Sequence, residues 1–268
     1  MSTAVTVPLI SKPLRPSGTG PASWAGSAAV FIAIMALWWL ASHQGWISKV
    51  FLPTPEATWL SLKNGLTEGE LKEFTWATIT RMFEGWLLAS LIGVALGALI
   101  GISANARAYL QPTLEFMRPL PASALLPLAI SIFGLNPNMV LSVVAFGAMW
   151  PVLLATVHGF AAVEPRLQEV ARCLQLSRGA FVWKVGLPNA LPDILAGMRL
   201  SLTVSLIVSV VGEMIASQPG LGQAILLAAR AFRASDLFAG IVLLGLIGFA
   251  SSALLAAFEK RFLKWQHP

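Results

Sequence analysis

Four stretches of this sequence contain no aspartate, glutamate, lysine or arginine, and their length constrains the fold more than any other feature. They cover residues 16–48, 85–106, 119–163 and 237–258. A helix that crosses a bilayer needs about 20 mostly apolar residues, and each stretch reaches that length. Only 11% of the residues are charged, whereas a soluble domain carries about 25%. Lipid is therefore the expected solvent for much of this chain.

The charge-free stretches predict an all-helical membrane protein with about six transmembrane helices. The stretch 119–163 is long enough for two helices, with turn-forming residues between them at Gly134–Asn138. A further span, Ile194–Ser217, is apolar apart from Arg199 and Glu213. The predicted spans are roughly 26–43, 82–103, 120–134, 138–158, 193–217 and 237–260.

The two ends of the chain and its basic residues predict its organisation and orientation. Residues 1–20 are rich in Ser, Pro and Gly and predict a disordered tail, followed by a single transmembrane domain over residues 21–268. A cleaved signal peptide is the alternative for the first span, but no small-residue cleavage site follows its long apolar run. With the N-terminus inside, cytoplasmic segments contain twice as many Lys and Arg as outside segments, counting Arg107 and Arg118 as cytoplasmic. This bias predicts that both termini are cytoplasmic.

The cytoplasmic segment 159–192 contains the most informative local pattern. Glu164-Pro165 is typical of a helix start, because proline suits the first helical position. Apolar residues then recur with the period of a short helix, at Leu167, Val170, Ala171 and Leu174. Such a short, charged helix cannot span a bilayer. We expect it to lie outside the membrane, with one face against this chain or a partner.

The same segment resembles the signature of permease subunits of ATP-binding-cassette importers. That signature runs Glu-Ala-Ala, three residues, Gly, nine residues, Ile, one residue, Leu-Pro. The matching residues here are Glu169-Val170-Ala171, Gln175, Val185 and Leu187-Pro188. Gln175 replaces a glycine, the residue that adopts positive φ most easily. Either the turn is built differently here, or the helix continues through it.

The resemblance covers roughly residues 50–265 and is greatest to the branch that imports sulfonates, taurine, nitrate or bicarbonate. Further matching pieces are Leu52–Pro55, Phe133-Gly134, Gly197–Arg199 and Gly212–Met214. The resemblance implies a type I importer fold in the bacterial inner membrane. It also implies a homodimer, two cytoplasmic ATPase subunits and a periplasmic solute-binding protein. The sequence contains no G-x-x-x-x-G-K-[ST] loop, so ATP and Mg²⁺ would bind the partner and this chain would carry no cofactor.

The resemblance also implies a role for the cytoplasmic segment. Leu167–Arg178 would be a coupling helix that docks on the ATPase, with polar contacts from Glu169 and Arg172. Ala171 would allow close approach, and Leu187-Pro188 would end the segment and redirect the chain into the fifth span. The candidate coupling residues are Leu167, Glu169, Val170, Ala171, Arg172, Leu174, Gln175, Leu187 and Pro188.

Candidate residues near the membrane faces have structural and functional interpretations. Glu213 lies inside a span, where an ionisable residue is a functional candidate by default. It is either paired with an arginine, Arg81 being a possible partner, or it belongs to a gate or pathway. His158, at the cytoplasmic end of the fourth span, is either structural or part of the pathway. Arg230 and Arg233 share a predicted helical face outside, where they are either solvated or contact the binding protein or an anionic solute.

Other classes of function receive less support from the sequence. A self-sufficient secondary carrier or channel is one alternative, but carriers usually show internal repeats and none is visible. A membrane enzyme would need convergent catalytic residues, and neither these nor a metal-ligand cluster is found. The basic residues separate apolar spans rather than form one face, which argues against nucleic-acid binding. The expected solute is small and anionic, with a small neutral or cationic vitamin precursor as the alternative. Gly93, Gly97 and Gly101 lie on one helix face, which predicts either close packing inside one subunit or a face that contacts another subunit or lines the pore.

Overall fold

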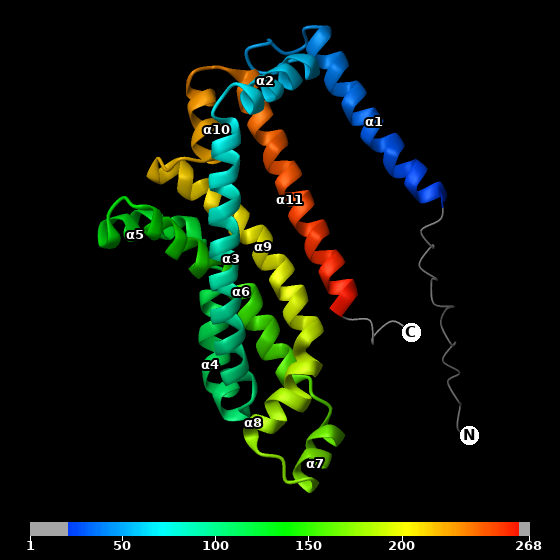
Figure 1. Ribbon diagram of the computed structural model, residues 1–268, viewed down its shortest axis with the longest axis vertical. Helices are drawn as coiled ribbons and strands as arrows, with labels where there is room; N and C mark the ends of the chain where they lie inside the picture. Colours follow the sequence, from blue (N-terminus) through cyan, green and yellow to red (C-terminus); the bar gives the residue numbers. More distant parts are fainter. Residues whose placement is uncertain (1–20, 263–268) are drawn as a thin grey trace, which may run out of the picture. The chain divides into compact units, whose positions relative to one another are not determined.

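The computed structural model describes residues 21–262, and every regular element within them is helical (Figure 1). The all-helical fold class predicted from the sequence is confirmed. The predicted disordered tail, residues 1–20, lies outside the described residues. The chain divides into two compact units, residues 1–55 and 56–268. The prediction of one domain over residues 21–268 stays a prediction.

The first unit contains one apolar helix, α1, Pro21–His43. Its segment Ala25–His43 is long and apolar enough to cross a membrane, in agreement with the first predicted span. Large side chains such as Val30 and Phe31 are more than 60% exposed, as expected for a surface that faces lipid. The indole Nε1 of Trp38 donates a hydrogen bond to the Pro53 carbonyl at 3.0 Å, which ties the following loop to this helix.

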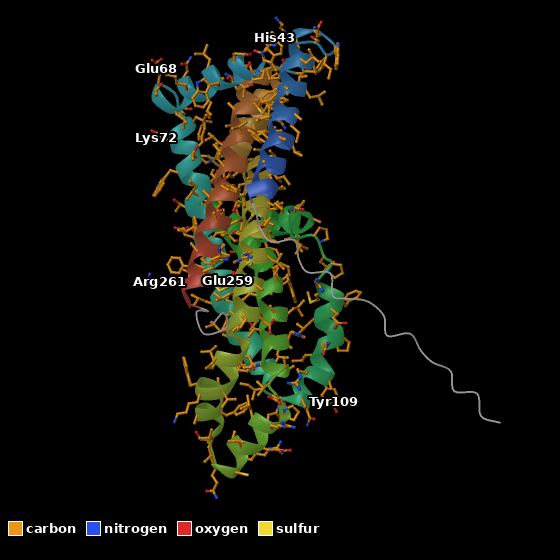
Figure 2. All side chains as sticks on the ribbon, turned by 90° about the vertical axis from the view of Figure 1, so that its right-hand side faces the viewer. His43, Glu68, Lys72, Tyr109, Glu259 and Arg261 are labelled. Atoms are coloured by element: carbon orange, nitrogen blue, oxygen red, sulfur yellow. The ribbon has the colours of Figure 1, made fainter. Side chains whose placement is uncertain are left out.

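The second unit begins with the short helix α2, Pro55–Thr67, and then contains four long apolar helices. These are α3 (Leu71–Gly101), α6 (Pro137–Ala161), α9 (Leu187–Ala216) and α11 (Ala234–Phe262). The helix α6 packs against both α3 and α9, and it contributes more buried apolar residues than any other described helix. In Figure 2, Glu68 and Lys72 mark the end of the unit where α3 begins, and Tyr109 lies toward the opposite end.

Glycines allow α3 to approach α6 closely. A Cβ atom on Gly93 would lie 2.9 Å from Val152 Cβ, and one on Gly97 would lie 2.6 Å from Thr156 Cβ. Both distances are too short for real side chains. The spacing of Gly93, Gly97 and Gly101 therefore serves helix packing inside this chain, the first of the two interpretations drawn from the sequence.

The third predicted span is a broken helix. It consists of α4 (Ala104–Met117), the 3₁₀ turn η1 (Ala122–Leu125) and α5 (Leu126–Phe133), and it bends by 79° at the break. The prediction of a span at 120–134 captured only its second half. Residues 104–117, which were counted with a cytoplasmic segment, form the helix α4, and α4 packs back against α3 and α6. Their cytoplasmic placement stays a prediction. Arg107 and Glu115 inside α4, and Arg118 directly after it, had excluded this helix from the charge-free stretches.

Two further segments complete the second unit. At one end of the bundle lie α7 (Pro165–Cys173) and α8 (Arg178–Phe181), and α10 (Leu221–Arg230) lies at the other end (Figure 1). The π-helical segment η2, Val182–Gly186, joins α8 to α9. The ion pair between Arg199 and Glu259 connects α9 to α11.

Candidate functional site

The short helix α7 presents an apolar face to the surface. Leu167, Val170 and Leu174 are 43%, 54% and 67% exposed, and the exposed Glu169 and Arg172 lie beside them. Proline at the first helical positions starts the helix, and Gln168 Nε2 donates to the Val163 carbonyl at 3.0 Å. The helix is thus anchored at its start, while three large apolar side chains remain uncovered.

Ala171 points the other way. It is only 6% exposed, and it lines a cavity of about 370 Å³ together with Ile102 and Ser103 of the α3–α4 turn. The expectation that Ala171 lets a partner approach closely was wrong, since this side chain packs against its own chain. Its side chain instead faces the space between α7 and the α3–α4 turn.

Gln175 adopts the backbone conformation of the glycine that it replaces. Its φ is +48°, in the left-handed region that favours glycine. The amide of Gln175 donates to the Arg172 carbonyl at 2.9 Å, and the amide of Leu176 donates to the Ala171 carbonyl at 3.0 Å. These two bonds form a Schellman motif, the common end of an α-helix. The turn is therefore kept without glycine, and the helix does not continue through it.

The predicted coupling helix Leu167–Arg178 was too long by about one turn, since α7 ends at Cys173. Leu187 is the first residue of α9 and Pro188 lies in its first turn, but the prediction that they end the preceding segment was wrong, because α8, η2 and α9 follow one another directly. Residues Gly179–Ala216 form one continuous helical segment that is long and apolar enough to cross a membrane. Proline has no amide hydrogen for the carbonyl four residues earlier, and the π-helical segment η2 directly before Leu187 accommodates this loss.

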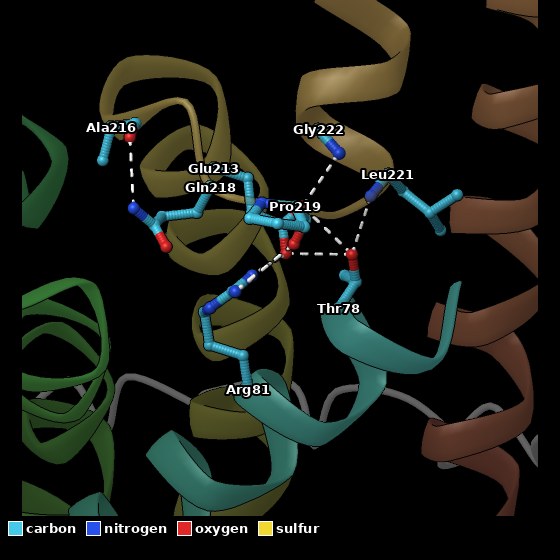
Figure 3. A network of polar contacts seen from close by, with 8 residues as sticks. All are labelled: Thr78, Arg81, Glu213, Ala216, Gln218, Pro219, Leu221 and Gly222. Atoms are coloured by element: carbon cyan, nitrogen blue, oxygen red, sulfur yellow. Dashed lines mark hydrogen bonds and ion pairs between the residues drawn. The ribbon is translucent and has the colours of Figure 1, made fainter. Parts of the chain in front are cut away.

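At the α10 end of the bundle, a buried carboxylate joins three helices (Figure 3). Glu213 of α9 is 0% exposed and forms an ion pair with Arg81 of α3. Its Oε1 and Oε2 accept from the Thr78 hydroxyl at 2.9 and 3.0 Å, and Oε2 also accepts from the Gly222 amide at 2.8 Å. We call Thr78, Arg81, Glu213 and Gly222 the Glu213 cluster.

The Glu213 cluster also satisfies the start of α10. The first amides of a helix have no partner inside that helix. Here the Leu221 amide donates to Thr78 Oγ1 at 2.9 Å, and the Gly222 amide donates to the carboxylate. The arginine partner expected for Glu213 is therefore present, and the cluster locks α3, α9 and α10 together. A role of Glu213 and Arg81 in a gate or pathway stays a prediction.

The remaining candidates lie apart from one another. His158 is exposed in the last turn of α6, where a basic side chain suits the negative end of the helix dipole. Arg230 is the last residue of α10, while Arg233 follows a turn and pairs with Asp236 at 3.2 Å. The prediction that Arg230 and Arg233 share a helical face was wrong, because α10 ends between them. Among residues 21–262, no group of three or more His, Cys, Asp or Glu side chains could hold a metal ion.

One cavity was missed by the sequence analysis. It has a volume of about 590 Å³ and lies between the break of the α4–α5 span and the helices α6 and α9. Arg118, which the sequence analysis counted as cytoplasmic, lines it together with Ser123 and Trp150. A charged residue directly before Pro119 was the available signal, since proline ends a helix and can place its neighbour at a break.

Comparison with known proteins agrees with this architecture. Residues 89–264 match the family described as binding-protein-dependent transport system inner membrane component. The chain is 34% identical over 244 residues to the putative aliphatic sulfonates transport permease protein SsuC of Bacillus subtilis (strain 168), covering 91% of this chain and 88% of that protein. It is 30% identical to the taurine transport system permease protein TauC of Escherichia coli (strain K12), covering 89% of each.

Solved structures show the same fold. An inward-facing structure of the MetNI methionine ABC transporter matches 70% of this chain and 95% of its own, with a TM-score of 0.60 and 21% identity. An amino acid ABC transporter crystallised with histidines matches 69% of this chain and 90% of its own, with a TM-score of 0.54 and 24% identity. Given a family match over most of the chain and curated relatives at 30% identity or more, this chain belongs to the binding-protein-dependent transport inner membrane components, the permease subunits of ABC importers.

Proposed function

We propose that this permease couples uptake of a small anionic solute to a separate ATPase through α7. The observation that carries the proposal is the uncovered apolar face of Leu167, Val170 and Leu174. Apolar side chains grouped on the surface of an end of the bundle mark a contact site for another protein. Glu169 and Arg172 beside them would supply the polar rim of that contact.

The proposed assembly contains two copies of this chain, two ATPase subunits and a solute-binding protein on the opposite side of the membrane. The family description supports the binding-protein partner. The sequence has no phosphate-binding loop, which supports ATP and Mg²⁺ binding on the partner and no cofactor or catalysis on this chain. Arg230 and Arg233, exposed at the α10 end, are candidates for contact with the binding protein.

The proposed solute has an anionic headgroup. Relatives of this chain are named as permeases for aliphatic sulfonates and for taurine, both of which carry a sulfonate. A third relative, from Synechococcus elongatus (PCC 7942), is named as a bicarbonate permease and is 29% identical. These names favour an anion over a neutral or cationic vitamin precursor.

The proposed location is the cytoplasmic membrane of a bacterium, with both termini and α7 in the cytoplasm. The excess of Lys and Arg in the segments on the α7 side supports this orientation. This excess of Lys and Arg remains when Arg118 is counted in the broken span and not in a cytoplasmic segment.

The proposal is tested by charging the apolar face of α7. Leu174→Asp places a carboxylate in the proposed contact, so we expect the cognate ATPase no longer to copurify and ATP-driven uptake into proteoliposomes to be lost. Leu66→Asp, an exposed leucine in α2 near the opposite end of α3, is the matched control and should leave ATPase binding intact. Normal copurification and uptake in the Leu174→Asp variant would contradict the proposal.

A further inference from the structure

A cavity of about 400 Å³ lies between α3, α9 and α11. Its walls include Phe83 of α3, Met198 of α9, and Leu254 and Phe258 of α11. Leu254 and Phe258 are 57% and 55% exposed, so the cavity reaches the outer surface of the bundle. Both residues lie inside the apolar span that ends at Arg261. We call this cavity the α9–α11 crevice, and its opening lies at the level of the membrane.

The hydrogen-bond donors of the crevice are already used within the chain. The indole Nε1 of Trp86 donates to the Met198 carbonyl at 2.9 Å. The hydroxyl of Ser251 donates to the Ile247 carbonyl of its own helix at 2.5 Å. No charged side chain among residues 21–262 lines the crevice. A polar solute would lose its hydrogen bonds to water there without replacement, so the lining favours a hydrocarbon chain.

Basic residues follow the crevice at one end of α11. Phe258 lines the crevice, and Arg261 lies on the same helix face, because residues three apart are neighbours on a helix surface. Lys260 and Arg261 are both exposed in the last turn of α11. Figure 2 shows Arg261 together with Glu259 at this end of the helix.

The two basic side chains have no carboxylate partner in the described part of the chain. The neighbouring carboxylate, that of Glu259, forms an ion pair with Arg199 of α9. The other ion pairs between described side chains lie at the α10 end. Lys260 and Arg261 therefore leave two positive charges beside the crevice, which favours an anionic group attached to the hydrocarbon chain.

The length of the crevice matches one leaflet of a bilayer. A rise of about 1.5 Å per residue places Arg261 about 15 Å from Ser251 along α11. This is half of the hydrocarbon thickness of a bilayer, which is about 30 Å. An acyl chain in the crevice would thus reach from the middle of the membrane to its surface, with its headgroup at the level of Arg261.

We propose that the α9–α11 crevice binds one acyl chain of an anionic phospholipid, and that Lys260 and Arg261 bind its phosphate. The lipid comes from the leaflet on the α7 side of the membrane. Its chain fills the space beside the Arg199–Glu259 ion pair and so holds the end of α11 against α9. This inference goes beyond the proposed function, because it concerns neither the solute nor the ATPase.

The test uses the assembled transporter in phosphatidylcholine nanodiscs that contain a small fraction of phosphatidylglycerol with a diazirine on its acyl chain. Light should attach this lipid to the α9 and α11 walls, within residues 191–202 and 251–258. The matched probe is phosphatidylcholine with the same diazirine chain at the same fraction. It should label these segments about tenfold less, because its headgroup carries no net charge for the basic residues to bind.

Paired variants test the two parts of the site. Lys260→Gln/Arg261→Gln should lower labelling by phosphatidylglycerol about tenfold, whereas Lys63→Gln/Arg230→Gln, which removes two exposed basic residues from α2 and α10, should not. Leu254→Trp enlarges an exposed wall of the crevice and should exclude the chain. Leu246→Trp, at a position on α11 that is 55% exposed and outside the crevice, should label as the wild type does. Copurification of the ATPase shows that each variant is assembled.

Three outcomes overturn the proposal. Equal labelling by the two diazirine lipids, or labelling that Lys260→Gln/Arg261→Gln leaves unchanged, would mean that the crevice accepts any acyl chain. Labelling that Leu254→Trp leaves unchanged would place the lipid elsewhere. Absence of label from both segments in the assembled transporter would mean that a second copy covers the crevice. Labelling requires neither solute nor ATP, so its result is independent of the test of coupling through α7.

Discussion

Replacing Glu213 by glutamine tests whether the Glu213 cluster holds the fold together. The carboxylate accepts from the Arg81 guanidinium and the Thr78 hydroxyl, and it accepts from the Gly222 amide at 2.8 Å. Glutamine has the same shape but only one acceptor oxygen. If that oxygen faces Arg81, the side-chain NH₂ faces the Gly222 amide. The reverse orientation turns the NH₂ toward Arg81, which then keeps only its hydrogen bond to the Pro219 carbonyl at 3.3 Å. In either case one donor loses its acceptor and meets another donor.

The expected loss follows from these contacts. An unsatisfied buried donor costs about 1–3 kcal/mol, and removal of one partner from a buried ion pair costs about 3–5 kcal/mol. Glutamine retains some of the hydrogen bonds, and the Arg81 side chain is 11% exposed, so water reaches part of it. We therefore expect the Glu213→Gln variant to lose about 2–4 kcal/mol of unfolding free energy.

Denaturant unfolding of the purified permease in detergent, followed by tryptophan fluorescence, measures this loss. Glu68→Gln, an exposed residue between α2 and α3, is the control and should unfold like the wild type. The double variant Arg81→Gln/Glu213→Gln should lose less than the sum of the single variants, because no buried charge is left unpaired. Wild-type stability of Glu213→Gln, or strict additivity in the double variant, would refute the structural role. If the Glu213→Gln variant also keeps normal uptake, a gate role is refuted as well.

Three further substitutions test other parts of the account. Glu169→Arg reverses a charge beside the apolar face of α7, and it should uncouple ATP hydrolysis from uptake; normal uptake would remove this residue from the proposed contact. Gln175→Gly relieves a left-handed backbone and should stabilise the permease by about 1 kcal/mol. Arg172→Gly, inside α7, is the control and should destabilise it by about 1 kcal/mol. Equal unfolding midpoints for the two variants would contradict the Schellman assignment. Gly97→Ala forces a Cβ to 2.6 Å from Thr156 Cβ and should lower the unfolding free energy by about 1–3 kcal/mol. Gly245→Ala is the control, since open space surrounds this position, and it should not lower the unfolding free energy. Similar thermal unfolding of the two variants would argue against the close α3–α6 contact.

The sequence predicted the long straight helices well, because each is an apolar stretch with few charges. The broken span was predicted poorly for the same reason. Arg107, Glu115 and Arg118 lie in or beside α4, so a rule based on missing charges assigned this helix to a loop. Neither the 79° bend nor the pocket that Arg118 lines follows from local sequence, since both depend on how α4 and α5 pack against α6 and α9.

The proposed coupling surface was predicted in part. The period of the apolar residues located the helix, but it could not tell which of them face the chain, and the structure buries only Ala171. The left-handed turn at Gln175 was foreseeable from the glycine that stands there in the family signature. The ion pair of Glu213 with Arg81 was also foreseeable, because a lone carboxylate in a span needs a partner. Its contacts with the start of α10 were not, since they depend on the chain turning back after α9.

The contact between α7 and an ATPase is tested most directly from Cys173. This residue is the one cysteine in the sequence, it is exposed, and it ends α7. A photoactivatable maleimide attached to Cys173 in the assembled transporter should cross-link to the ATPase subunit. The same reagent on a Cys173→Ala/Arg230→Cys variant, labelled at the end of α10, should not. Cross-linking to the ATPase from position 230, or its absence from Cys173 in a transporter that hydrolyses ATP, would contradict the account.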